Sequence, residues 1–122
     1  MGVRLVKSSV YLGRFHEGSP VVTVRSNGME LPLNPRHDLR NHSPTGFAWG
    51  YCGSGPSQLA LAILAHHFGP GRHTIALLLY HRFKEQVLSR LDADTSFSLD
   101  SSVIREECKA IRKQLRGYHH GQ

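Results

Sequence analysis

A glycine-rich turn followed by a continuous apolar run constrains this chain more than any other feature. The turn is Gly50-Tyr51-Cys52-Gly53-Ser54-Gly55-Pro56, and the apolar run covers residues 59–65. A helix that is apolar on every face must be covered on most sides, so we expect a central buried helix. Pro56 suits its first position, because the N–H group that proline lacks would be unpaired there. Gly55 or Ser54 is the expected N-cap.

The segment before the turn is rich in strand-forming residues. Residues 10–15 and 21–25 combine β-branched and aromatic side chains, which favour strands. Asn27-Gly28 predicts a tight hairpin, because both positions tolerate positive φ, and the chain would return over residues 29–33. Together these strands form a small antiparallel meander. The alternating aromatic residues that follow permit a short fourth strand: Phe47, Trp49 and Tyr51.

The second half of the chain has the spacing of helices. The central helix should end before Gly69, and apolar residues recur at helical spacing over residues 74–91. After a short extended segment at residues 97–99, Asp100 is placed to cap a third helix. A frayed tail is expected from Gly117. The apolar stripe of the third helix is expected to contain Val103, Ile104, Ile111 and Leu115.

Strands followed by helices, in a chain of 122 residues, favour a single domain over residues 1–122 with an α+β fold. We expect a small antiparallel β-sheet of three to four strands, with about three α-helices packed on one face. The first residues lack a signal-peptide pattern, and the longest apolar run is too short to span a membrane. We therefore predict a cytoplasmic protein without membrane contact, in which Cys52 and Cys108 are reduced.

The chain carries an uneven positive charge. Its formal net charge is +6 with histidine neutral. Residues 1–84 contain nine Lys and Arg residues and three acidic ones, whereas the remaining residues are neutral overall. The basic residues are expected to be scattered and not clustered on one helix. A positive field favours acidic partners such as a nucleic acid, a nucleotide or an acidic protein surface. The alternative is that the charge serves solubility alone.

The glycine-rich turn has two interpretations. Free N–H groups at a helix N-terminus attract anions, so Ser54 and Gly55 are candidates for holding a phosphate. The spacing does not match the P-loop, which would have Gly-Lys-Ser/Thr at residues 55–57. It does not match the Gly-x-Ser-x-Gly elbow of hydrolases either. The alternative is that the glycines allow tight packing beneath Trp49 and Tyr51.

Catalysis and metal binding receive little support from the sequence. Cys52 lies near a helix start, where a thiolate is stabilised, and His42 is a candidate base. No acidic residue is placed to orient His42, so Cys52 is better explained as a small residue that fills a tight turn. His66 and His67 are adjacent on a helix and point to different faces, so they do not chelate a metal together. We predict no catalytic residue, metal or cofactor.

Residues 36–43 are the most polar stretch of a long connection. Arginine offers paired donors to a phosphate or a carboxylate, and aromatic rings nearby can stack on nucleic-acid bases. The alternative is that Asp38 pairs with an arginine while Asn41 and Ser43 satisfy loop backbone groups. The predicted ligand- or partner-binding residues are Arg36, Arg40, Asn41, His42, Trp49, Tyr51, Ser54 and Gly55.

The motif WGYxGSGPxQLALA, at residues 49–62, resembles that of an uncharacterised family of small domains. The family is found in bacteria, plasmids and phages, and the resemblance covers most of residues 10–105. No activity is assigned to it, so the resemblance implies which positions matter and not which chemistry they perform. Cys52 stands where we expect glycine in the family's turn, which argues against a shared catalytic thiol.

The resemblance and the charge together predict a non-enzymatic accessory protein of a phage or mobile element. It would inhibit a host defence system, in the manner of anti-CRISPR proteins, by binding an acidic protein surface or a nucleoprotein complex in the bacterial cytoplasm. Two alternatives stay open. One is a nucleotide or phosphate-ligand binding protein, or a small enzyme, that uses the glycine-rich turn with Arg36, Arg40 and His42. The other is direct binding of DNA or RNA with a steep salt dependence.

Overall fold

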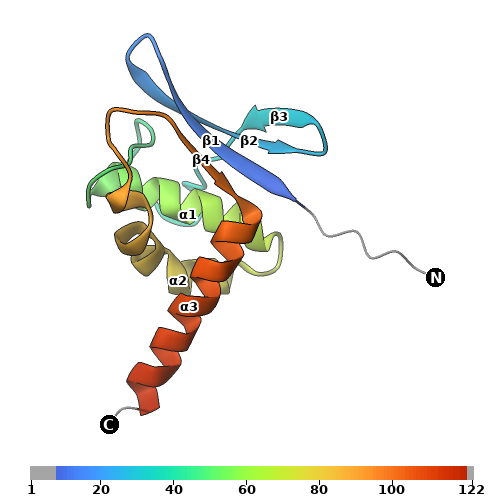
Figure 1. Ribbon diagram of the computed structural model, residues 1–122, viewed down its shortest axis with the longest axis vertical. Helices are drawn as coiled ribbons and strands as arrows, with labels where there is room; N and C mark the ends of the chain where they lie inside the picture. The colour runs from blue at the N-terminus through green and yellow to red at the C-terminus, as the bar shows by residue number, and fades with distance from the viewer. Residues whose placement is uncertain (1–7, 121–122) are drawn as a thin grey trace, which may run out of the picture.

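The computed structural model describes the backbone of residues 8–120 and the side chains through residue 117. Four strands form one antiparallel sheet in the order β3-β2-β1-β4: β1 (Ser9–His16), β2 (Ser19–Ser26), β3 (Met29–Pro32) and β4 (Phe97–Asp100). The helices lie on one side of this sheet (Figure 1). They are α1 (Ser54–Phe68), α2 (His73–Gln86), a short 3-10 helix η1 (Leu88–Arg90) and α3 (Ser101–His120). The predicted α+β fold is confirmed.

Two tight hairpins join the first three strands. Glu17 and Gly18 both have positive φ, of 49° and 81°, and so do Asn27 and Gly28, of 53° and 76°. Two-residue turns of this kind match the right-handed twist of antiparallel strands. The second hairpin lies where the Asn27-Gly28 pair predicted it.

The fourth strand does not lie where it was predicted. Residues 47–51 form a loop, because Gly50 has a φ of +90° that a regular strand does not adopt. The fourth strand is β4, which pairs antiparallel with β1 at the edge of the sheet opposite β3. Phe97 and Leu99 alternate along it and are buried, so they extend the inner face of the sheet. Since β4 follows α2 in the sequence, the strands do not all precede the helices.

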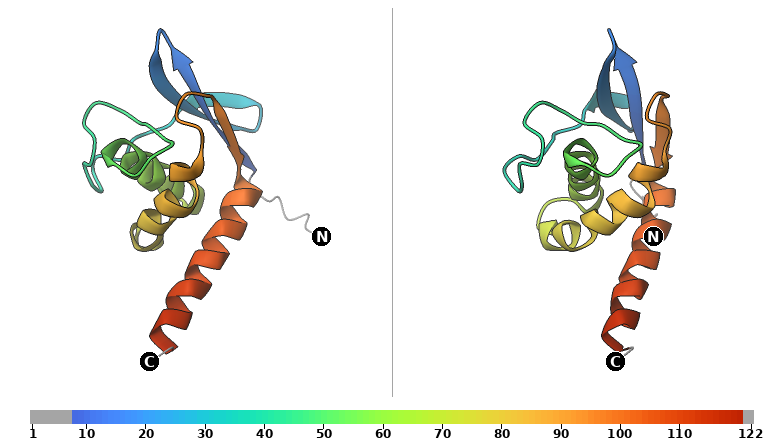
Figure 2. Two further views of the ribbon diagram at one scale, coloured as in Figure 1. Left: turned by 60° about the vertical axis from the view of Figure 1, so that its left-hand side comes forward. Right: turned by 90° about the vertical axis from the view of Figure 1, so that its left-hand side faces the viewer.

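The helix α1 is the centre of the fold. It lies between the sheet and α2 (Figure 1 and Figure 2), and residues 59–65 are all at most 2% exposed. Contact on every side explains why its apolar run has no polar face. Its N-cap is Gly53 instead of Gly55 or Ser54, and no side chain caps it. It ends before Gly69, as predicted.

The ends of the other helices depart from the predictions. The predicted helix over residues 74–91 is two elements, since α2 ends at Gln86 and the chain tightens into η1. The predicted cap of α3 is confirmed: Asp100 Oδ1 accepts the N–H of Ser102 at 2.7 Å. The backbone of α3 stays helical past Gly117 to His120, and residues 121–122 lie outside the described part of the chain.

One apolar face of α3 packs against the rest of the molecule. Ile104, Cys108 and Ile111 are buried, and Leu115 is partly buried against them. Val103 was predicted to belong to this face but is 45% exposed. It lies about 100° around the helix from Ile104, which turns it toward solvent.

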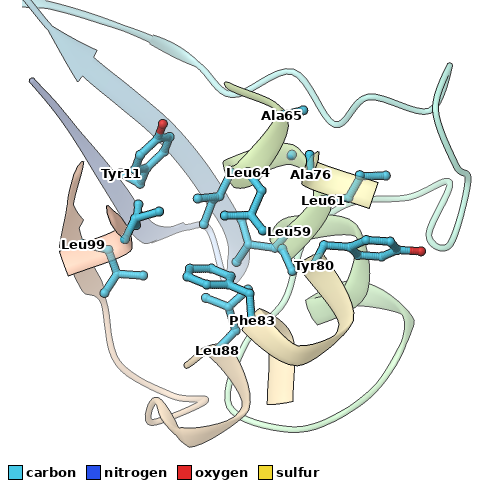
Figure 3. Packing of buried hydrophobic residues seen from close by; sticks show 14 of the residues in the cluster. Tyr11, Leu59, Leu61, Leu64, Ala65, Ala76, Tyr80, Phe83, Leu88 and Leu99 are labelled. Atoms are coloured by element: carbon cyan, nitrogen blue, oxygen red, sulfur yellow. The ribbon is translucent and has the colours of Figure 1, made fainter. Parts of the chain in front are cut away.

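The core lies between the inner face of the sheet, α1, α2 and η1. Figure 3 shows side chains from all four meeting in one cluster, among them Tyr11, Leu64, Phe83, Leu88 and Leu99. Over the residues that the structure describes, no helix is long and apolar enough to cross a membrane.

Candidate functional site

One buried side chain holds the polar loop of residues 34–43 against α1. Gln58 is fully buried on α1. Its Oε1 accepts the backbone N–H groups of His42 and Ser43, at 2.7 and 3.1 Å. Its Nε2 donates to the backbone carbonyl oxygens of Pro35 and Arg40, at 2.6 and 3.0 Å. All four hydrogen-bonding positions of the amide are therefore used to shape this loop.

Arg36 is engaged within the same loop. Its φ of +61° is uncommon for a residue other than glycine. Its guanidinium donates to both carboxylate oxygens of Asp38, at 3.0 and 2.9 Å, and Nη1 lies 3.3 Å from Nε2 of His73. The hydrogen bond from Arg36 lowers the pKa of the Asp38 carboxyl. The structure thus shows Asp38 paired with an arginine, and most donors of Arg36 are already used.

The next three residues of the loop have different neighbours. Arg40 and Asn41 are exposed, and Nη1 of Arg40 donates to the carbonyl oxygen of Leu39 at 2.8 Å. His42 is partly buried, and its Nε2 lies 2.7 Å from the hydroxyl of Tyr80. Burial raises the pKa of Tyr80, so its phenol stays protonated at neutral pH. This hydrogen bond ties His42 to α2.

The glycine-rich turn lies in close contact with two other segments. A Cβ atom on Gly50 would lie 2.5 Å from the backbone of Ala93, and one on Gly55 would lie 2.7 Å from Cβ of Ala48. Only glycine allows so close an approach. The packing interpretation of the turn therefore has direct support. An anion site at Gly55 and the exposed Ser54 stays a prediction.

The two aromatic residues of the turn have opposite environments. Trp49 is 2% exposed, and its Nε1 donates to the carbonyl oxygen of Thr95 at 3.0 Å. Its ring packs edge-on against Phe97, with the ring centroids 4.8 Å apart. The prediction that Trp49 stacks on a base or a partner is wrong, because the core covers its ring. Tyr51 is half-exposed and is open to a partner.

A cavity of about 340 Å³ lies between the C-terminal end of α1, the start of β1 and the first half of α3. We call it the α1–α3 cavity. Among the residues that the structure describes, no Asp or Glu lines it. Its basic lining residues are Arg72, Arg105, Lys109, Arg112, His66 and His67.

A row of basic side chains runs from this cavity along α3. Arg105, Lys109, Arg112 and Arg116 stand at positions i, i+4, i+7 and i+11, which share one face of a helix, and all four are exposed. We call them the basic stripe. Each follows directly after a position of the apolar face, so the stripe lies beside the surface that packs on the body. The second half of α3 extends away from the sheet (Figure 1), which leaves the stripe open to a partner.

Carboxylates neutralise the basic residues of the sheet more closely than those of α3. On the outer face of the sheet, Glu30 forms ion pairs with Arg14 and Arg25. The hydrogen bond from Arg14 is the main cause that lowers the pKa of Glu30 to about 2. On the stripe, Lys109 and Glu106 are 3.6 Å apart and highly exposed, and such pairs contribute little. The stripe therefore keeps more of its positive charge.

The floor of the α1–α3 cavity is neutral and fixed by hydrogen bonds. Oη of the buried Tyr11 lies 2.6 Å from Nδ1 of His66, and the N–H of Ser9 donates to Oγ of Ser101 at 3.2 Å. Burial raises the pKa of Tyr11, and it raises that of the Cys108 thiol to about 12. Both groups stay protonated at neutral pH. The charge of the cavity is therefore set by its basic rim.

The predicted site residues do not include the basic stripe, although its spacing is visible in the sequence. The prediction that the basic residues are scattered is wrong for α3, because four of them share one face. Arg105, Arg112 and Arg116 each follow a predicted apolar residue of the third helix by one residue, which was a usable signal. The contribution of Arg72 had no such signal, since it depends on how the turn between α1 and α2 lies against α3.

The sequence profile of a protein family matches residues 11–110, which include the glycine-rich turn, Gln58 and most of the α1–α3 cavity. The family is described as a family of unknown function (DUF6166). The chain belongs to this family. The DUF6166 match confirms the predicted membership of an uncharacterised family, whereas the motif as a family signature and the occurrence in phages stay predictions. Comparison with curated proteins and with solved structures yields no match.

Proposed function

We propose that this DUF6166 protein is a non-enzymatic binding protein that docks on a nucleoprotein complex through the basic stripe. The observation that carries the proposal is the exposed row of basic side chains on α3, which begins at a cavity with a basic rim. A row of this kind attracts a chain of phosphates. Binding is favoured because it releases the counterions condensed on that chain. Three of the four stripe residues are arginines, whose paired donors fit phosphate oxygens.

The surroundings of the stripe favour the nucleic-acid component of such a complex over an acidic protein surface. Protein partners draw most of their binding energy from a few buried aromatic or aliphatic anchors. Among the described residues, none of the exposed large apolar side chains lines the α1–α3 cavity. Those side chains are Phe15, Val21, Met29, Leu31, Tyr51, Leu78 and Val103.

The proposed setting is the cytoplasm of a bacterial host, with the protein as an accessory factor of a phage or mobile element. An inhibitor of a nucleoprotein defence complex fits this setting. Such a complex binds its guide and target strands through their phosphate backbones in a positively charged channel. A small basic protein that covers these phosphates would compete with the protein subunits of the complex for the nucleic acid.

Fluorescence anisotropy tests the proposal with a short labelled single strand, the corresponding duplex and a labelled polyglutamate chain. We expect the nucleic acids to bind, with the logarithm of the association constant falling linearly with the logarithm of salt concentration. A slope of about −3 for the single strand corresponds to the four stripe residues each neutralising one phosphate. A salt-independent affinity, or tighter binding of polyglutamate than of either nucleic acid, would contradict the proposal.

A further inference from the structure

The α1–α3 cavity is deeper than the surface along the rest of α3, because it has a buried floor below its basic rim. Its arginine and lysine side chains belong to exposed residues and form the rim. The residues of its floor are buried: Ser9, Tyr11, Ser101 and Cys108. A ligand group that reaches this floor must therefore enter end-on, past the basic rim.

We propose that this cavity binds the terminal phosphate of a nucleic-acid strand. This proposal rests on the proposed function and names the chemical group that the cavity recognises. A phosphodiester inside a strand has a sugar on both sides, so it can run along the rim but cannot project to the floor. A terminal phosphate is substituted on one oxygen only. At neutral pH, such a monoester carries a charge of about −1.5 to −2 and three strong acceptor oxygens.

The cavity surrounds such a group with arginines from two walls. Arg72 lines it from the turn between α1 and α2, while Arg105 and Arg112 line it from α3. The guanidinium carbon of Arg72 lies 5.6 Å from the centroid of the Phe68 ring, which holds the side chain, and the backbone N–H of Arg72 donates to the carbonyl oxygen of Gly69 at 3.2 Å, which holds the turn. Donors on separate walls suit a tetrahedral phosphate, whose oxygens point in several directions, better than a flat carboxylate.

The basic side chains beyond the cavity give the following phosphates a path. Lys109 and Arg112 line both the cavity and a second hollow along α3, which Lys113 and Arg116 also line. The two hollows therefore share a basic border. A strand whose end lies in the cavity can place its next phosphodiesters on Lys113 and Arg116.

Single strands of identical sequence test the proposal, one with a 5′-phosphate and one with a 5′-hydroxyl, together with the corresponding 3′ pair. For the wild type, we expect one phosphorylated end to bind about tenfold more tightly than its hydroxyl counterpart, as for a gained charge-assisted hydrogen bond. Arg72→Ala should remove this preference and leave the affinity for the hydroxyl end nearly unchanged. Arg116→Ala, the control outside the cavity, should weaken the binding of both ends alike.

The outcomes separate this proposal from the proposed function. If all strands bind with the same affinity whatever their ends, the terminal-phosphate pocket is overturned while strand binding stands. If no strand binds, both are overturned. A phosphorylated peptide or a free mononucleotide that binds more tightly than the phosphorylated strand also overturns the pocket proposal. Urea denaturation should show wild-type stability for both variants, because Arg72 and Arg116 are exposed.

Discussion

Two regions of this molecule carry closely spaced basic residues, and the fold uses them in opposite ways. In the loop of residues 34–43, Arg36 is paired with Asp38, and Gln58 takes up backbone groups on both sides of them. On α3, the basic stripe is exposed and its ion pair with Glu106 is weak. Polar residues in an irregular segment are often needed for that segment's own hydrogen bonds. Charged residues on one face of a regular helix are not, because the helix satisfies its own backbone.

The largest expected effect comes from Gln58, whose side chain supports the loop of residues 34–43. Gln58→Ala deletes four hydrogen bonds and leaves buried and partly buried backbone groups unpaired, so we expect the free energy of unfolding to fall by about 3–5 kcal/mol. Urea denaturation measures this loss. Gln86→Ala is the control, since Gln86 bonds one exposed side chain, Gln114, and should cost less than about 1 kcal/mol. Similar losses for the two variants would refute the supporting role of Gln58.

The second-largest expected effect comes from Gly50 in the glycine-rich turn. Comparing it with Gly28 separates the contribution of close packing from that of positive φ. Gly50 and Gly28 both have positive φ, of 90° and 76°. A Cβ on Gly50 would meet the backbone of Ala93, whereas one on Gly28 would meet nothing within 4 Å. We expect Gly50→Ala to lower the free energy of unfolding by about 2–4 kcal/mol and Gly28→Ala by about 1 kcal/mol. If thermal and urea unfolding show equal losses, close packing is not the reason for glycine at position 50.

The smallest expected effect comes from Glu30, whose carboxylate pairs with Arg14 and Arg25 on the sheet. Ion pairing lowers the pKa of Glu30 to about 2, from an ordinary 4.5. The stability that Glu30 contributes is therefore fully present above pH 4.5 and is lost as the pH falls toward 2. Glu30→Gln should lower the melting temperature slightly at neutral pH, and the difference from the wild type should vanish near pH 2. Melting curves at a series of pH values measure this difference.

The same variant also tests whether nucleic-acid strands bind the outer face of the sheet as well as α3. Glu30→Gln leaves Arg14 and Arg25 without their carboxylate, so the sheet becomes more positive. If strands bind on the stripe, their affinity should change by less than about twofold, because separated surface charges are screened by salt. A clear gain in affinity would mean that the outer face of the sheet belongs to the binding surface.

Local signals in the sequence were enough to predict several elements of the fold. Asn27-Gly28 predicted a hairpin and Asp100 a helix cap, since both act on their immediate neighbours. Residues 59–65 predicted a central helix, because no exposed helix has such a composition. The position of β4 could not be predicted in this way. It depends on Phe97 and Leu99 pairing beside β1, which is distant in the sequence.

The candidate site was predictable only in part. The spacing of Arg105, Lys109 and Arg112 on a predicted helix is a local signal. The position of Arg72 on the rim of the same cavity follows from the packing of separate segments. For Trp49, the sequence suggested a binding role that the structure does not support. An aromatic residue beside a glycine turn suggested a stacking site, yet its ring completes the core because β4 places Phe97 against it.

Matched charge reversals test most directly whether α3 and not the loop is the binding surface. The α3 variant is Lys109→Glu/Arg112→Glu, and the control variant is Arg40→Glu/Arg90→Glu, which combines a loop residue with a residue of η1. Both variants change the net charge equally, and all four residues are exposed. The measurement is the dissociation constant for one labelled single strand at fixed salt concentration. We expect the α3 variant to lose about 100-fold in affinity and the control variant less than about threefold. Equal losses, or a larger loss for Arg40→Glu/Arg90→Glu, would contradict this account.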